Sequence, residues 1–139
     1  MSEPQVGDLV LGAARGLGRA LDAALVAAGG STSTWHVLRA VRTTEARSQA
    51  ELAATVGVRQ PTLTHHLDGL ERSGLVTRWR DPDNRRVQRV LLTPAGEELF
   101  VRLRRAAAAF EGRLTAGLED GDVRTLRRLL ALLVENSAE

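Results

Sequence analysis

The sequence predicts a mainly α-helical protein with one small β-hairpin near its middle. Two observations carry this prediction. Over most of the chain apolar residues recur every three to four positions, which is the spacing of helices with one buried face. Between residues 75 and 92 this spacing gives way to two short segments rich in Val, Leu, Thr and Trp, which flank the turn-forming run Asp81-Pro-Asp-Asn84.

Capping residues and glycines set the bounds of the helices expected before the hairpin. These helices run from Val6 to Ala28, from the N-cap candidates Ser31 to Thr34 through Val41, from the capping box Ser48-Gln-Ala-Glu51 to about Gly57, and from about Gln60 to Gly74. The hairpin strands are expected at Leu75 to Arg80 and Val87 to Leu92.

After the hairpin, Thr93-Pro94 restarts a helix that fades near Gly117. The acidic run Glu119 to Asp122 suits the positive N-terminal end of a last helix. Residues 126–134 of that helix are apolar around too much of its circumference for one solvated face, and the first and fifth helices also need cover. We therefore expect a homodimer joined through its terminal helices, with a monomeric helical cap over the hairpin as the alternative.

Composition narrows the classes of function. The 139 residues include no cysteine, which excludes disulfides, thiolate zinc sites and thiol redox sensing. No apolar run is long enough to cross a membrane, and the N-terminus does not resemble a signal peptide, so we expect a cytoplasmic protein without a membrane partner. The net charge is only +2, so any argument for nucleic acid depends on where the basic residues lie.

The order helix, short helix, helix and hairpin is that of a winged helix-turn-helix, in which the second helix of the turn enters the major groove of double-stranded DNA. With Leu63, Leu67 and Leu70 inward, at about 100° per residue the helix turns polar residues outward. The outward set is Pro61, Thr64, His65, Asp68 and Arg72, with Thr62 at its flank and Gln60 at the entry of the helix. The candidates for DNA contact are Gln60, Pro61, Thr62, Thr64, His65 and Arg72. The alternative is an ordinary solvated helix face.

Arginines crowd into the hairpin, and all nineteen basic residues of the chain are arginine. Arg85 and Arg86 lie at the expected tip, where an arginine can enter a narrow minor groove. Arg78, Arg80 and Arg89 on the strands are candidates for flanking phosphates.

From about Thr34 to Leu99 the chain resembles the MarR family of bacterial transcriptional regulators. The matching stretches are Trp35-His-Val-Leu38, Gln49-Ala-Glu-Leu-Ala53, Val58-Arg-Gln-Pro-Thr-Leu-Thr64, Leu67-Asp-Gly-Leu-Glu-Arg-Ser-Gly-Leu-Val76, Asp81-Pro-Asp-Asn-Arg-Arg86 and Leu92-Thr-Pro-Ala-Gly96. The resemblance implies a dimer that binds a pseudo-palindrome, usually as a repressor released by a small molecule. It divides the single domain into dimerisation helices at 5–30 and 94–139 and a DNA-binding lobe at 31–93.

The resemblance also implies residue roles. Gln60, Pro61, Thr62, Thr64 and His65 match recognition-helix positions, and Arg86 matches the wing-tip arginine. His65 stands where the family often has arginine, so its base contact departs from the family pattern. Asn84 stands at the position of the usual wing aspartate, which can brace the wing arginine, so the pose of Arg86 departs from that pattern as well. In the family's ligand crevice a small anionic aromatic effector is expected near Arg15, Trp35, His36 and Arg39, unless Trp35 is core and the arginines are surface.

Two further readings carry less weight. The run Gly12-Ala-Ala-Arg-Gly-Leu-Gly18 imitates the phosphate-binding turn of short-chain dehydrogenases, so a nucleotide-binding enzyme fragment using Gly12, Gly16 and Gly18 is the alternative. The catalytic tyrosine and lysine of that family have no counterpart, because the chain contains neither residue type, and we expect no enzyme and no cofactor. His65 and His66 point about 100° apart on one helix and suit a shared ion poorly, so no metal site is expected.

Overall fold

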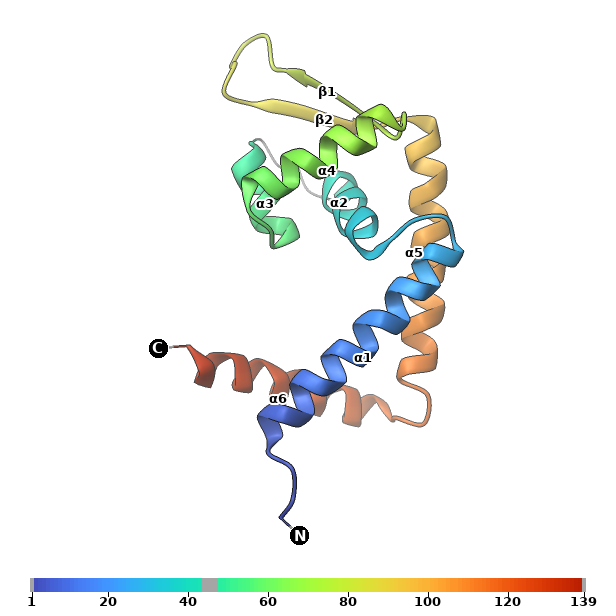
Figure 1. The fold of residues 1–139 in the computed structure, drawn as a ribbon, viewed down its shortest axis with the longest axis vertical. Coiled ribbons are helices and arrows are strands. Elements are labelled where there is room, and N and C mark those ends of the chain that lie inside the picture. The colour runs from blue at the N-terminus through green and yellow to red at the C-terminus, as the bar shows by residue number, and fades with distance from the viewer. Residues whose placement is uncertain (1, 44–47, 139) are drawn as a thin grey trace. The chain divides into compact units, whose positions relative to one another are not determined.

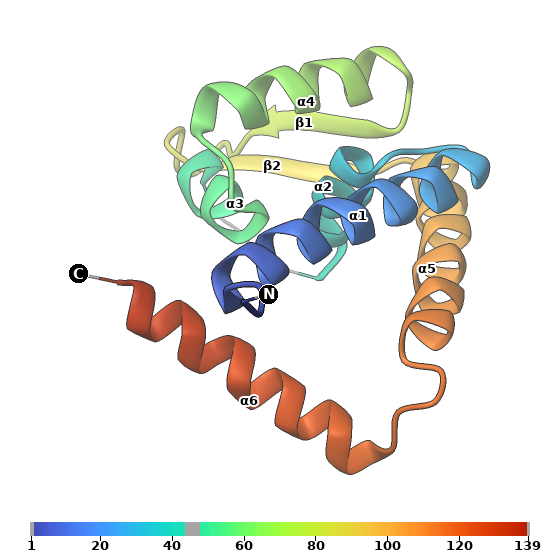
Figure 2. The ribbon, with the colours of Figure 1, turned by 60° about the horizontal axis from the view of Figure 1, so that its bottom comes forward.

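The computed structural model of the chain describes residues 2–43 and 48–138, and it confirms the predicted class, mainly α with one hairpin. Figures 1 and 2 show the order of the elements. They are α1 (Val6–Ala27), α2 (Thr32–Thr43), α3 (Gln49–Val56), α4 (Gln60–Arg72), β1 (Val76–Arg80), β2 (Gln88–Leu92), α5 (Pro94–Leu114) and α6 (Asp120–Ser137). The chain divides into two compact units, one up to Ala107 and one from Ala108 onward.

Local chemistry sets the helix bounds where the sequence places them. The hydroxyl oxygen of Ser48 accepts a hydrogen bond from the backbone N–H of Glu51 and so caps α3. Gly57 follows that helix with φ +84°, a left-handed conformation that glycine adopts without strain. Pro61 lies in the first turn of α4, where its missing N–H costs nothing.

The first unit has one hydrophobic core, to which α1 to α5 and β1 all contribute. The predicted stripe of α4 is confirmed, since Leu63, Leu67 and Leu70 are all buried. Among the described residues, the buried apolar ones are Leu25, Trp35, Val37, Leu38, Ala40, Leu52, Ala53, Leu63, Leu67, Leu70, Val76, Leu99, Phe100 and Leu103.

The hairpin is antiparallel, with Val76 opposite Leu92 and Arg80 opposite Gln88. Within the first unit, α4 lies along the hairpin, and the turn of the hairpin and the N-terminal end of α4 are at the same end (Figures 1 and 2). This packing joins the two elements that the sequence nominates for DNA contact.

The second unit holds the end of α5 and the whole of α6. The side chains of Glu119 and Asp122 form a capping box at the start of α6, which gives the predicted acidic run a specific role in addition to its charge. No described residue of α6 is buried, and its leucines at positions 126, 129, 130, 132 and 133 are all exposed. A helix with so much exposed apolar surface normally has a partner.

Candidate nucleic-acid interface

The exposed face of α4 consists of short polar side chains near the start of the helix. Because Leu63 and Leu67 face the core, Gln60, Pro61 and Thr62 are exposed and Thr64 is half-buried. His65 is also exposed. The structure thus places the five recognition-helix candidates together at one end of α4.

A cavity of about 410 Å³ opens beside this end of the helix. Its walls are formed by Gln49 from α3 and by Gln60, Pro61, Thr64, His65 and Asp68 from α4. The wall carries hydroxyl, amide, imidazole and carboxylate groups, which are the side-chain groups that read base edges.

Gln49 joins the recognition helix to the hairpin. The hydroxyl of Thr64 donates a hydrogen bond to the Oε1 atom of Gln49 at 3.2 Å. The Nε2 atom of Gln49 in turn donates to Oε1 of Gln88, the first residue of β2. Sequence reasoning missed both glutamines, since residues 49, 64 and 88 meet only through the packing of three elements.

Arg78 makes a second link between the same two elements. From β1 its guanidinium donates to the carboxylate of Asp68 and reaches Oε1 of Glu71 at 3.3 Å, both on α4. Burial alone would lower the pKa of Arg78, but these two carboxylates raise it. Its side chain is only 13% exposed. Arg78, predicted to hold a phosphate, lies against α4 in this structure. The two-residue alternation of a strand was the available signal, because it puts Arg78 on the same face as the buried Val76.

Asp81 holds the turn of the hairpin, the wing. Its Oδ1 atom accepts hydrogen bonds from the backbone N–H groups of Asp83 and Asn84, and its Oδ2 atom pairs with Arg89 at 2.9 Å. These contacts, the backbone N–H of Asp83 foremost and Arg89 next, hold the pKa of Asp81 below its ordinary value. Arg89, expected at a phosphate, is therefore engaged within the wing.

Asn84 and Arg80 complete the wing. The Oδ1 atom of Asn84 accepts from the backbone N–H of Arg86 at 3.2 Å, and Arg80 donates to the backbone oxygen of Arg85 at 2.8 Å. Asn84 thus braces the backbone at Arg86, although it lacks the charge of the usual aspartate. Both Arg85 and Arg86 are exposed, and neither guanidinium has a hydrogen-bond or ion-pair partner within residues 2–43 and 48–138.

Comparison with known proteins places this arrangement in a family. The family model described as "MarR family" matches residues 31–87, which cover α2, α3, α4, β1 and the wing turn. The structure of CouR from Rhodococcus jostii bound to p-coumaroyl-CoA shares 30% sequence identity, covers 91% of this chain and 89% of its own, and has a TM-score of 0.77. The chain belongs to the MarR family.

Two further solved structures resemble the chain over nearly its whole length. The transcriptional repressor CouR bound to a 23-mer DNA duplex shares 27% identity, covers 96% of this chain and 99% of its own, and has a TM-score of 0.81. A mutant MarR from E. coli complexed with operator DNA shares 26% identity, covers 92% of each chain and also has a TM-score of 0.81. Their winged-helix fold is that of this chain, a transcription regulator of the MarR family.

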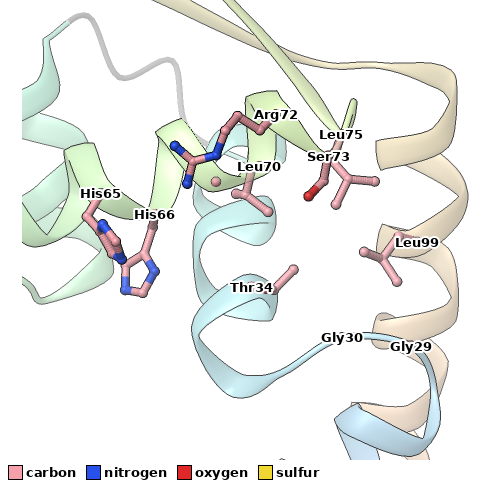
Figure 3. A pocket seen from close by; sticks show the side chains of 11 residues that line it. Gly29, Gly30, Thr34, His65, His66, Leu70, Arg72, Ser73, Leu75 and Leu99 are labelled. Carbon is pink, nitrogen blue, oxygen red and sulfur yellow. The ribbon is translucent and has the colours of Figure 1, made fainter.

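A second cavity, of about 310 Å³, lies at the other end of α4 (Figure 3). His66 and Arg72 of α4 face it from one side, and Thr34 of α2 and Leu99 of α5 from the other. Arg72, expected at DNA, thus lines this cavity and not the one beside the start of α4.

None of the four candidates for effector contact lines either cavity. Trp35 is 6% exposed and stacks on Phe100 with 5.5 Å between ring centroids, so it belongs to the core. The guanidinium of Arg39 covers the Trp35 ring at 5.3 Å. Burial, and then the charge of Arg39, lower the pKa of the neighbouring His36. Arg15 lies on the exposed surface of α1.

The glycine-rich segment does not form a phosphate-binding turn in this structure. Gly12, Gly16 and Gly18 all lie inside α1, and none has a positive φ. The strand and sharp turn that a nucleotide site requires are therefore replaced by continuous helix. Within residues 2–43 and 48–138 no three His, Asp or Glu side chains are grouped so that they could hold a metal ion. In the same residues no helix is long and apolar enough to cross a membrane.

Proposed function

We propose that the chain is a repressor that binds a pseudo-palindromic operator as a homodimer and is released by a small molecule. One observation carries the proposal. The start of α4, with its exposed polar residues, and the turn of the wing, with Arg85 and Arg86, lie at the same end of the first unit, so one DNA duplex can meet both.

Each element has its own role on the DNA. Gln60, Pro61, Thr62, Thr64 and His65 face base edges in the major groove, where the pattern of donors and acceptors identifies each base pair. Arg85 and Arg86 enter the adjacent minor groove, and Arg80 supports them from the strand. Arg78 positions α4 and does not contact phosphate, and Arg72 lies beyond the stretch that faces bases.

Exposed apolar surface on the terminal helices supports the homodimer. Val6, Leu9 and Leu11 of α1 are each more than half exposed, and Val134 of α6 is 70% exposed. Residues 5–30 and 94–139 accordingly form the dimerisation helices, and residues 31–93 form the DNA-binding lobe. Two recognition helices related by a two-fold axis fit half-sites whose centres lie about 34 Å apart, one turn of DNA.

The second cavity is the proposed effector site. Its 310 Å³ matches the lower end of ligand pockets, about 300 Å³. Arg72 provides a cation for an anionic ligand, and Leu70, Leu75 and Leu99 provide apolar walls for an aromatic ring. A relative binds p-coumaroyl-CoA, so acyl-CoA thioesters and free aromatic carboxylates are the first ligands to test. A ligand there contacts α4 directly and acts by favouring a dimer whose recognition helices are wrongly spaced for DNA.

Selection of bound fragments from random DNA tests the proposal, followed by anisotropy titration of the selected duplex at two salt concentrations. We expect an enriched pseudo-palindrome that one dimer binds, with affinity falling steeply as salt rises. Sedimentation of the free protein at micromolar concentration measures the dimer independently. Fragments without enrichment, bound equally at both salts, would contradict the proposal. Adding p-coumaroyl-CoA or coumarate to the complex then tests release.

A further inference from the structure

The hydroxyl of Thr64 has its proton committed inside the protein. It donates to Oε1 of Gln49 at 3.2 Å, and this amide is in turn oriented by Gln88, whose Oε1 accepts from Nε2 of Gln49. With its nitrogen directed at Gln88, Gln49 has only its oxygen to offer to Thr64. A threonine hydroxyl carries a single proton and two lone pairs, so what remains available to a ligand is acceptor only.

Thr64 lines the cavity beside the start of α4, so these lone pairs are what its hydroxyl can offer to a ligand there. Asp68, one helical turn further along the same wall, is also an acceptor, and its charge is balanced by Arg78. Thr64 and Asp68 therefore both accept hydrogen bonds on this wall and offer no donor of their own, whereas the imidazole of His65 between them carries an N–H.

In the major groove the exposed edges of bases differ in this respect. Adenine and cytosine display amino groups, N6 and N4, which donate, whereas guanine and thymine display the acceptor O6 or O4 at the corresponding place. A transition, A to G or C to T, replaces the donor with an acceptor on the same strand. A threonine that can only accept a hydrogen bond therefore distinguishes adenine from guanine and cytosine from thymine.

We infer that Gln49 fixes the hydrogen-bonding polarity of Thr64, so that Thr64 selects an amino base over a keto base at one position of each half-site. The inference rests on the proposed function, since it requires α4 in the major groove. Gln49 is a positioning residue here: it acts on the base through Thr64. The inference therefore gives α3, which lies outside the recognition helix, a role in sequence specificity.

The experiment uses the full-length protein and three variants. Selection from random DNA gives the base preference of the wild type and of Thr64→Val at every position. The position whose preference changes in Thr64→Val is the one that Thr64 reads. Anisotropy titrations then compare duplexes with the selected base and with its transition at that position, for the wild type, Gln49→Met and Gln49→Glu. Circular dichroism melting verifies that each variant is folded.

We expect the wild type to bind the amino base about fivefold more tightly than its transition, as the loss of one hydrogen bond predicts. Gln49→Met has no acceptor, which releases the hydroxyl proton, so the ratio falls to between one and two. Gln49→Glu is the matched control. Its carboxylate only accepts, so the ratio persists even though the added charge weakens binding to all DNA. Preferences at the other positions stay unchanged in both.

Three results would overturn the inference. They are a wild-type preference for the keto base at the Thr64 position, a Gln49→Met ratio equal to that of the wild type, and an unchanged preference at every position in Thr64→Val. The first needs only Thr64→Val, to locate the position, and so does not depend on how the two Gln49 variants fold. In all three cases an operator is still selected and bound, which distinguishes them from failure of the proposed function, where no sequence is enriched.

Discussion

Arg78 on β1 donates a hydrogen bond to the carboxylate of Asp68 on α4, and the same guanidinium reaches Glu71 one turn further along that helix. The wing and the recognition helix are thus joined by a charged contact whose basic member is largely buried. In the proposed complex the two elements meet adjacent grooves of one duplex, so their mutual position determines whether both can bind.

Arg78→Ala is expected to lower the free energy of unfolding by about 1–2 kcal/mol, because two carboxylates lose a largely buried partner. Specific DNA binding also weakens, since Asp68 is left as an unbalanced negative charge beside the phosphates. Urea denaturation and anisotropy titration measure the two effects. The control is Arg42→Ala, which removes the ion pair with Glu97 at 3.3 Å, where both side chains are about half exposed. That change should cost less than about 0.5 kcal/mol. Equal losses in the two variants would contradict a special role for Arg78.

Arg86→Ala is expected to weaken binding to all DNA sequences, because a minor-groove arginine responds mainly to the electrostatic potential. The slope of log affinity against log salt should become shallower by about 0.9, as for the loss of one phosphate contact. Arg105→Ala removes the same charge from an exposed position on α5 and serves as the control. An Arg86→Ala protein with the affinity and salt slope of the control would remove Arg86 from the interface.

Gly96→Ala is expected to destabilise the fold by about 1–3 kcal/mol, the usual cost of overpacking. A Cβ atom at Gly96 would lie 2.1 Å from the backbone oxygen of Leu75, which cannot move without shifting the start of the hairpin. Gly69→Ala in α4 is the matched control, since its Cβ would meet only the far end of Arg72 at 3.9 Å. That substitution should stabilise by about 0.5–1 kcal/mol, the helical preference of alanine over glycine. Thermal melting of both variants measures the two effects. A Gly96→Ala protein that melts at the temperature of the wild type would contradict the close contact between position 96 and the backbone oxygen of Leu75.

Stability is expected to fall as the pH drops below 6.5, owing in part to His36. Burial and the charge of Arg39 lower the pKa of His36, so over this range the unfolded chain binds a proton that the folded chain does not. His36→Gln should therefore lose less stability than the wild type between pH 7.5 and 5.5, measured by urea denaturation. Hydrogen bonds from the backbone N–H groups of Thr32 and Asp83 lower the pKa values of Asp22 and Asp81. The stability that these two aspartates confer is lost only as the pH falls below their ordinary pKa of 3.8, which lies outside the range from pH 7.5 to 5.5. An identical pH dependence in His36→Gln would disprove the assignment.

The sequence predicts the secondary structure of this chain well because the signals are local. The leucine stripe of α4, the cap at Ser48 and the turn at Asp81 each depend on residues within a few positions of one another. The exposed face of α4 follows from the stripe, because a helix that buries Leu63 and Leu67 must turn Thr62 and His65 away from the core.

Contacts between elements could not be predicted in the same way. The partners of Arg78 depend on how α4 lies against β1, and the contact between Gln49 and Thr64 spans fifteen positions. Trp35 is equally suited by its sequence to a ligand wall and to the core. Only the stacking of its ring on Phe100, 65 positions away, decides for the core.

The hydroxyl of Thr93 has a mechanical consequence. It donates to the backbone oxygen of Gly74, just past α4, and accepts from the backbone N–H of Gly96 in the first turn of α5. The backbone N–H of Thr93 also donates to the oxygen of Leu75. These three hydrogen bonds to backbone atoms join the end of α4, the start of the hairpin and the first turn of α5, so a tilt of α5 must either break one of them or turn the end of α4 with it. Thr93 thus acts as a rigid coupling, through which strain applied to α5 reaches α4, the proposed recognition helix.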